Sequence, residues 1–187
     1  MDPARKPATY EDLLAVPDRM VAEIVSGRLH ASQRPAPRHS QAASGIGADI
    51  YSAYHRGRGG PGGWWSLGEP ELHLGGDVLV PDIAGWRVER LPALPETAYF
   101  EVAPNWLCEV LSPSTGRLDR TEKLPAYARQ SIQHVWLVDP LQQTLEVFEN
   151  RNHEWVLIAT HAGAETFRAK PFEEVEFELA PLWTTRA

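Results

Sequence analysis

The segment Trp106–Leu111 (WLCEVL) is a short, almost continuous apolar run, which is typical of a central strand covered on both faces. A helix is predicted directly after it, over Leu118–Gln130. Three further strands are then predicted over His134–Asp139, Thr144–Glu149 and Trp155–Thr160. Strands that alternate with a helix in this order favour an α/β fold with a mixed central sheet.

The first half of the chain predicts shorter elements. Thr9 is placed to cap a helix over Tyr10–Leu14, and Val21–Leu29 predicts a β-hairpin with Glu23 on its first strand. A longer helix is expected over His39–His55. Further strands are expected over Trp64–Leu67, Glu71–Leu74 and Val78–Trp86.

A length of 187 residues favours a single domain over 1–187. No run is long and apolar enough to cross a bilayer, and Met1–Tyr10 lacks the apolar core of a signal peptide, so we expect a cytoplasmic protein without a membrane segment. The single cysteine, Cys108, excludes an intrachain disulfide and any multi-cysteine metal site, and we expect it to be a packed core thiol. Any metal must then be held by oxygen or imidazole.

The net charge of −7 argues against a protein that coats nucleic acid through bulk positive charge. The charge is unevenly distributed, because Arg28–Arg58 contains five arginines and one acidic residue, Asp49. A local contact with phosphates therefore stays open.

Two carboxylates lie in strands that are otherwise apolar, Asp82 in VLVPDIAGW and Glu109 in WLCEVL. A buried carboxylate is costly without a partner, a metal or a raised pKa, and two on neighbouring strands suggest a shared site. We expect the two carboxylates to converge at the C-terminal side of these strands. Carboxylate oxygens favour Mg²⁺ or Mn²⁺, which keep waters and phosphate oxygens in their shell. A cation is expected nearby, and Lys123 lies in the helix after the Glu109 strand.

The order of these blocks resembles the PD-(D/E)XK nuclease superfamily and, more closely, its Uma-type family of restriction endonuclease-like proteins. The resemblance rests on TYEDLL, AEIVSGRL, PRHS, DVLVPDIA and EVLSPST and continues to the strand at Trp155, so it covers nearly the whole chain. It implies a restriction-endonuclease-like α/β fold with a mixed, bent central sheet flanked by helices. It also implies a Mg²⁺-dependent endonuclease that hydrolyses DNA, with Mn²⁺ able to substitute, and a homodimer that cuts two strands.

The resemblance makes Asp82 and Glu109 metal ligands and catalytic residues, and Lys123 the catalytic lysine. Glu23 becomes a further metal ligand or a supporting residue. The superfamily places the lysine two residues after the glutamate, where this chain has Leu111. The resemblance therefore implies a lysine that has migrated to the next helix, and Pro125 is interpreted as marking the start of that helix close to Lys123.

Three residues are candidates for nucleic-acid contacts. Arg38 and His39 lie at a helix entrance inside the basic segment, and Ser112 follows the Glu109 strand, so each can approach a phosphate. The alternatives are a solvated loop for Arg38 and His39 and a loop-capping hydroxyl for Ser112.

Structural interpretations also stay open for the candidate active site. Asp82 can cap a turn, Glu109 can belong to a structural ion pair, and Lys123 can be an exposed partner of Asp119 one helical turn away. The competing functions are a nucleic-acid-binding or regulatory module with little turnover and, third, a metal-dependent hydrolase of small phosphoesters.

Overall fold

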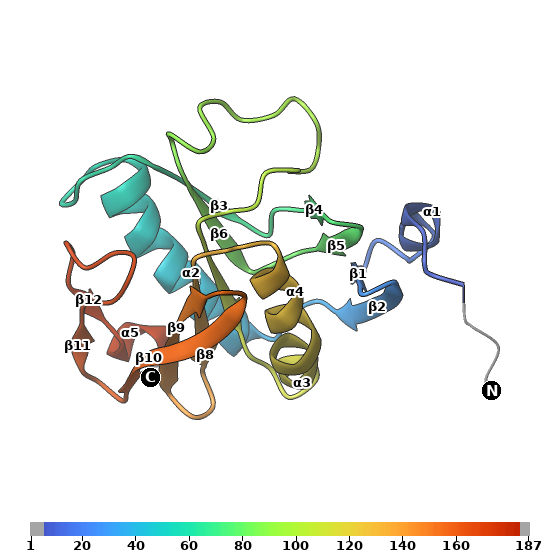
Figure 1. Cartoon of the computed structure of the whole chain (residues 1–187). Helices are drawn as coiled ribbons and strands as arrows, with labels where there is room; N and C mark the ends of the chain where they lie inside the picture. Colours follow the sequence, from blue (N-terminus) through green and yellow to red (C-terminus); the bar gives the residue numbers. More distant parts are fainter. Residues whose placement is uncertain (1–5, 184–187) are drawn as a thin grey trace.

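The computed structural model describes residues 6–183 and contains a six-stranded sheet at its centre (Figure 1). Its strand order is β10-β9-β8-β7-β6-β3, and only β7 and β8 run parallel, so the sheet is mixed as predicted. The strands are β3 (Trp64–Gly68), β6 (Ile83–Arg87), β7 (Trp106–Val110), β8 (His134–Asp139), β9 (Thr144–Arg151) and β10 (Glu154–Ala162).

A second sheet has four antiparallel strands in the order β2-β1-β5-β4, and it includes the predicted hairpin. Its strands are β1 (Met20–Val25), β2 (Arg28–Gln33), β4 (Leu72–Leu74) and β5 (Asp77–Leu79). The short strands β11 (Thr166–Phe167) and β12 (Phe177–Glu178) form a separate pair.

The single strand predicted over Val78–Trp86 is wrong, because the chain leaves the four-stranded sheet after β5 and enters the six-stranded sheet at β6. Pro81 lies in this connection and has no N–H for a strand ladder, which accounts for the break. The residue after it, Asp82, therefore lies where the two sheets meet.

Five α-helical segments and two π-helical turns (η1, η2) accompany the sheets in the described part of the chain. They are α1 (Tyr10–Leu14), α2 (Pro37–Ile50), η1 (Tyr51–His55), α3 (Gly116–Leu118), η2 (Asp119–Lys123), α4 (Leu124–Arg129) and α5 (Ala180–Trp183). The predicted first helix is confirmed, with a capping box between Thr9 and Asp12. Helix α2 begins two residues before the predicted start, because proline fits the first helical turn.

The central strands are covered on both faces, by α2 on one side and by α4 on the other (Figure 1). Along β7, Trp106, Cys108 and Val110 belong to the core that includes α2, and Leu107 belongs to the core that includes α4. Cys108 is thus the buried core thiol that the sequence predicted. Because side chains alternate along a strand, Glu109 points toward α4.

Among the described residues, no helix has the length and apolar character needed to cross a membrane. The single domain predicted over 1–187 stays a prediction, and its first five and last four residues lie outside the described range.

Candidate active site

Asp82 lies directly before β6, beside the end of β7. Its Oδ2 accepts a 2.7 Å hydrogen bond from the backbone N–H of Val110, which ties the carboxylate to the neighbouring strand. We expected Asp82 and Glu109 to meet at the carboxyl ends of their strands. This is wrong for Asp82, because β6 and β7 are antiparallel and the start of β6 lies beside the end of β7. Both carboxylates nevertheless line one cavity of about 440 Å³.

Lys123 reaches this cavity from η2 and is buried, with 3% of its surface exposed. Its ammonium lies 2.8 Å from Oε1 of Glu109, which is also 3% exposed, and 2.8 Å from Oε1 of Glu23. The interpretation of Lys123 as an exposed partner of Asp119 is therefore wrong, since that carboxylate is buried too and lies farther away, at 3.8 Å. The contact with Glu109 itself fits both a catalytic lysine and a structural ion pair.

The charges around Lys123 determine its protonation. Burial alone lowers the pKa of an ammonium, but the carboxylates of Glu109 and Glu23 outweigh burial and raise the pKa of Lys123 well above its usual value. The lysine is thus held as a cation at neutral pH.

The carboxyl of Asp119 is affected differently, because burial raises its pKa to about 6 although Lys123 opposes the change.

Glu23 joins the site from the other sheet. Its Oε1 accepts a 2.8 Å hydrogen bond from the N–H of Val80, the residue that follows β5, and the same oxygen contacts Lys123. β1 pairs with β5 in the four-stranded sheet, which places Glu23 next to the connection into β6. The hairpin therefore supplies a carboxylate to the junction between the sheets.

Tyr127 is a member of the cluster that sequence reasoning missed. Its phenol is fully buried and donates a 2.5 Å hydrogen bond to Oε1 of Glu109. Asp119, Lys123 and Tyr127 recur at intervals of four residues, which places them on one face of a helix. This spacing is the sequence signal by which Tyr127 could have been found.

The helical segment that holds Lys123 differs from the prediction. Helical structure begins at Gly116, so Lys123 lies well inside the segment and Pro125 does not mark its start. The N–H of Leu124 bonds to the carbonyl of Asp119, and this wider π-helical turn lies directly before the proline, which has no N–H to donate. Leu111, at the usual lysine position, is part of the apolar core on the α4 side.

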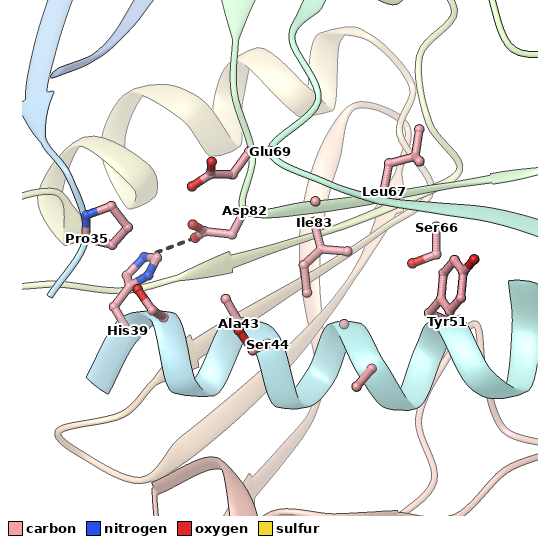
Figure 2. A pocket seen from close by; sticks show the side chains of 14 residues that line it. Pro35, His39, Ala43, Ser44, Tyr51, Ser66, Leu67, Glu69, Asp82 and Ile83 are labelled. Atoms are coloured by element: carbon pink, nitrogen blue, oxygen red, sulfur yellow. Dashed lines mark ion pairs between the residues drawn. The ribbon is translucent and has the colours of Figure 1, made fainter. Parts of the chain in front are cut away.

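His39 and Asp82 form a pair that also lines this cavity (Figure 2). Nε2 of His39, in the first turns of α2, lies 3.3 Å from Oδ2 of Asp82. Burial lowers the pKa of this imidazole, but the hydrogen bond and charge of Asp82 outweigh burial, so the pKa of His39 is raised. Arg38 is exposed beside it. The histidine thus contacts the site through the predicted metal ligand.

Ser112 lines the same cavity and also organises its own loop. Its hydroxyl oxygen accepts a 3.1 Å hydrogen bond from the N–H of Thr115 and lies 3.0 Å from the hydroxyl of Ser114. The loop-capping alternative for Ser112 therefore has contacts that support it, and its role toward phosphate stays a prediction.

The fold thus brings Asp82 before β6, Glu109 on β7 and the buried Lys123 of η2 to one cavity. A family model described as "Putative restriction endonuclease" (Uma2) matches residues 7–181, so the chain belongs to this family. Among solved structures, a "putative nuclease belonging to DUF820" from Anabaena variabilis ATCC 29413 has a TM-score of 0.77 and 23% sequence identity. That match covers 95% of this chain and 98% of that chain and supports the fold. A search of curated proteins found no match.

Proposed function

We propose that this protein is a metal-dependent endonuclease that hydrolyses phosphodiester bonds of DNA. The observation that carries the proposal is that Asp82, Glu109 and the buried Lys123 line one cavity. A buried cation beside two carboxylates at the end of a sheet is suited to phosphoryl chemistry, which needs charge stabilisation and an oriented water. Membership of a restriction endonuclease family supports the same chemistry.

The donor set fits a hard divalent cation. Every contact described for the carboxylates of Asp82, Glu109 and Glu23 uses one oxygen of each group, Oδ2 or Oε1. Within residues 6–183, no group of three or more His, Cys, Asp or Glu side chains is arranged to hold a metal ion. Mg²⁺ is usually bound by one or two carboxylates with waters completing its shell, so Asp82 and Glu109 suffice.

Bound there, Mg²⁺ or Mn²⁺ would polarise the phosphate and lower the pKa of a water. Lys123 holds a positive charge beside Glu109, where it orients the attacking water and offsets the charge that develops on the phosphate. Glu23 contacts both Lys123 and the N–H of Val80, which favours a supporting role over direct ligation. Tyr127 fixes the orientation of the Glu109 carboxylate.

Substrate contacts and assembly belong to the same proposal. His39 and Ser112 line the cavity, and Arg38 is exposed beside His39 at the start of α2. In this proposal the three residues contact phosphates that flank the cleaved bond. Residues 6–183 present one such cluster, so cutting both strands of a duplex calls for a homodimer. Light scattering across micromolar concentrations tests this, and a mass equal to the 20.9 kDa chain would exclude the dimer.

The test of function is nicking of a supercoiled plasmid with Mg²⁺ or Mn²⁺, compared with the same reaction in a chelator. Asp82→Asn is expected to abolish cleavage and to leave the melting temperature almost unchanged, because an amide oxygen can still accept from Val110. Titration calorimetry with Mn²⁺ should show binding to the wild type and weaker binding to the variant. Early melting of Asp82→Asn would point to a structural ion pair instead.

A binding module with little turnover is the second candidate. It is favoured by Lys123, whose ammonium is already engaged by Glu23 and Glu109, and by Leu111 at the usual lysine position. Metal-independent DNA binding without nicking would establish this candidate. Competition by a small phosphoester would instead indicate a hydrolase of small substrates.

A further inference from the structure

A second cavity, of about 640 Å³, continues from the candidate active site along α2 (Figure 2). The two cavities share four lining residues, Pro35, His39, Glu69 and Asp82. One wall of the second cavity is α2, and the opposite wall comes from β3 and the start of β6. We call this cavity the α2 groove.

The α2 groove is kept open by small side chains on the helix. Ser40, Ala43, Ser44 and Gly47 line it, although glycine inside a helix costs stability. A Cβ at Gly47 would lie 3.7 Å from Cδ1 of Ile83, an ordinary contact, so packing within this chain does not require a glycine there. What the missing side chain provides is clearance in the groove.

An aromatic side chain marks the far end of the α2 groove. Tyr51 is 41% exposed, lines the groove and lies at the opposite end from His39 (Figure 2). Its ring centroid is 4.3 Å from that of His55, which supports it from one side. At ~1.5 Å of rise per residue, His39 and Tyr51 are about 18 Å apart along the helix. The groove is thus long enough for a short stretch of an extended polymer.

Positive charge flanks both ends of this helix. Arg38 lies in its first turn, and Arg56 and Arg58 follow η1. All three are exposed, and none forms an ion pair with any residue between 6 and 183. None of the three lines the α2 groove itself, whose acidic lining residues are Glu69 and Asp82. Arginines beyond both ends of the helix suit a ligand that extends past the groove and carries repeated negative charges.

We propose that the α2 groove binds an unpaired DNA strand, with a base stacked on Tyr51 and phosphates at the flanking arginines. The inference rests on the proposed nuclease function, because the strand continues into the carboxylate and lysine cluster. The strand is unpaired because a base can enter a concave pocket only when it is outside a duplex. Stacking on an aromatic ring combined with a few cationic contacts is typical of single-strand binding.

The test is fluorescence anisotropy with a labelled single-stranded oligodeoxynucleotide and a matched duplex, both in EDTA so that no cleavage occurs. The single strand is expected to bind more tightly than the duplex. Tyr51→Ala should weaken single-strand binding by roughly 5- to 150-fold, the effect of losing one stacked base. Tyr10→Ala is the matched control, because Tyr10 has a similar exposure of 37% and does not line the groove.

A second variant blocks the α2 groove without touching Tyr51. Ser44→Trp places a bulky ring in the groove, and Leu157→Trp places the same ring on an exposed position in β10, outside it. Only Ser44→Trp should lose binding, with unchanged circular dichroism in both. The logarithm of the binding constant should fall with the logarithm of salt concentration at a slope of about −2, as expected for three phosphate contacts.

Two outcomes would overturn the groove proposal. One is a duplex that binds as tightly as the single strand, and the other is wild-type binding by both Tyr51→Ala and Ser44→Trp. Plasmid nicking with Mg²⁺ separates this inference from the proposed function. If plasmid nicking is insensitive to both variants, the nuclease proposal stands and the groove proposal is wrong. If the single strand binds in EDTA but no cleavage occurs with Mg²⁺, the groove proposal stands and the nuclease proposal is wrong.

Discussion

The phenol of Tyr127 and the ammonium of Lys123 contact the same oxygen of Glu109, at 2.5 and 2.8 Å. Two donors on one buried oxygen hold the carboxylate in one orientation and compensate its charge. Tyr127 and Lys123 are one helical turn apart on the same helical face. Their contacts with Glu109 therefore link this face to β7 at the candidate active site.

Tyr127→Phe is expected to reduce the free energy of unfolding by about 1.5–3 kcal/mol, because it removes a hydrogen bond to a buried charged group. Tyr54→Phe is the matched control. Tyr54 is also buried and donates a 3.0 Å hydrogen bond to Glu174, but that carboxylate is exposed and water can replace the donor. Urea unfolding of both variants checks the difference, and equal losses would contradict it.

Lys123→Met is expected to destabilise the protein by roughly 3–5 kcal/mol, since it leaves the buried carboxylates of Glu23 and Glu109 without their cation. Lys170→Met is the control, because Lys170 lies 3.0 Å from Glu149 but is 47% exposed. An exposed pair contributes at most about 1 kcal/mol. Urea unfolding in EDTA measures both losses, and a loss for Lys123→Met no larger than for the control would contradict the ion-pair network.

The rate of DNA cleavage distinguishes a catalytic role of Lys123 from a purely structural role. At a temperature where the variant is fully folded, Lys123→Ala should cleave DNA about 10²–10⁴-fold more slowly, the usual scale for a positioned proton-transfer group. Mn²⁺ affinity should be largely retained, because lysine is not a ligand. Lys123→Arg should not restore cleavage, since a planar guanidinium cannot replace a compact ammonium. Wild-type rates in the alanine variant would assign Lys123 to structure alone.

The pKa of Asp119 predicts a pH dependence of stability. Burial raises this pKa from 3.8 to about 6 in the folded protein, so the folded state binds the proton more tightly than the unfolded state. This contribution to stability is present at low pH and is lost as the pH rises through about 6. Asp119→Asn should therefore gain stability relative to the wild type from about pH 4 to about pH 7. Urea unfolding in EDTA across this range checks the sign, and a constant difference would refute it.

Two helix glycines in α2 should respond differently to alanine. Both substitutions gain helix propensity, worth up to about 1 kcal/mol. A Cβ at Gly47 meets nothing closer than 3.7 Å, whereas a Cβ at Gly45 would lie 2.8 Å from Cδ2 of the buried Leu182. Gly47→Ala should therefore raise the melting temperature more than Gly45→Ala. A higher melting temperature for Gly45→Ala than for Gly47→Ala would contradict this. It would mean that Leu182 moves away from the new methyl group at little cost.

The sequence by itself determined most of the elements and indicated that the carboxylates of Asp82 and Glu109 need compensating groups. Periodicity and capping act over a few residues, so the helix after Thr9, the hairpin with Glu23 and the strand around Glu109 were predictable. A carboxylate inside an apolar strand needs a compensating group wherever it lies, which made a site predictable before any partner was known.

Only the tertiary structure decided which groups meet. Glu23 joins Lys123 because the four-stranded sheet packs beside the start of β6. Asp82 lines the same cavity as Glu109 because β6 and β7 are antiparallel. The π-helical turn before Pro125 determines where Lys123 points. These relationships depend on strand pairing and packing between distant segments, which local sequence patterns do not encode. The sequence therefore specified the chemical groups, and the fold specified their geometry.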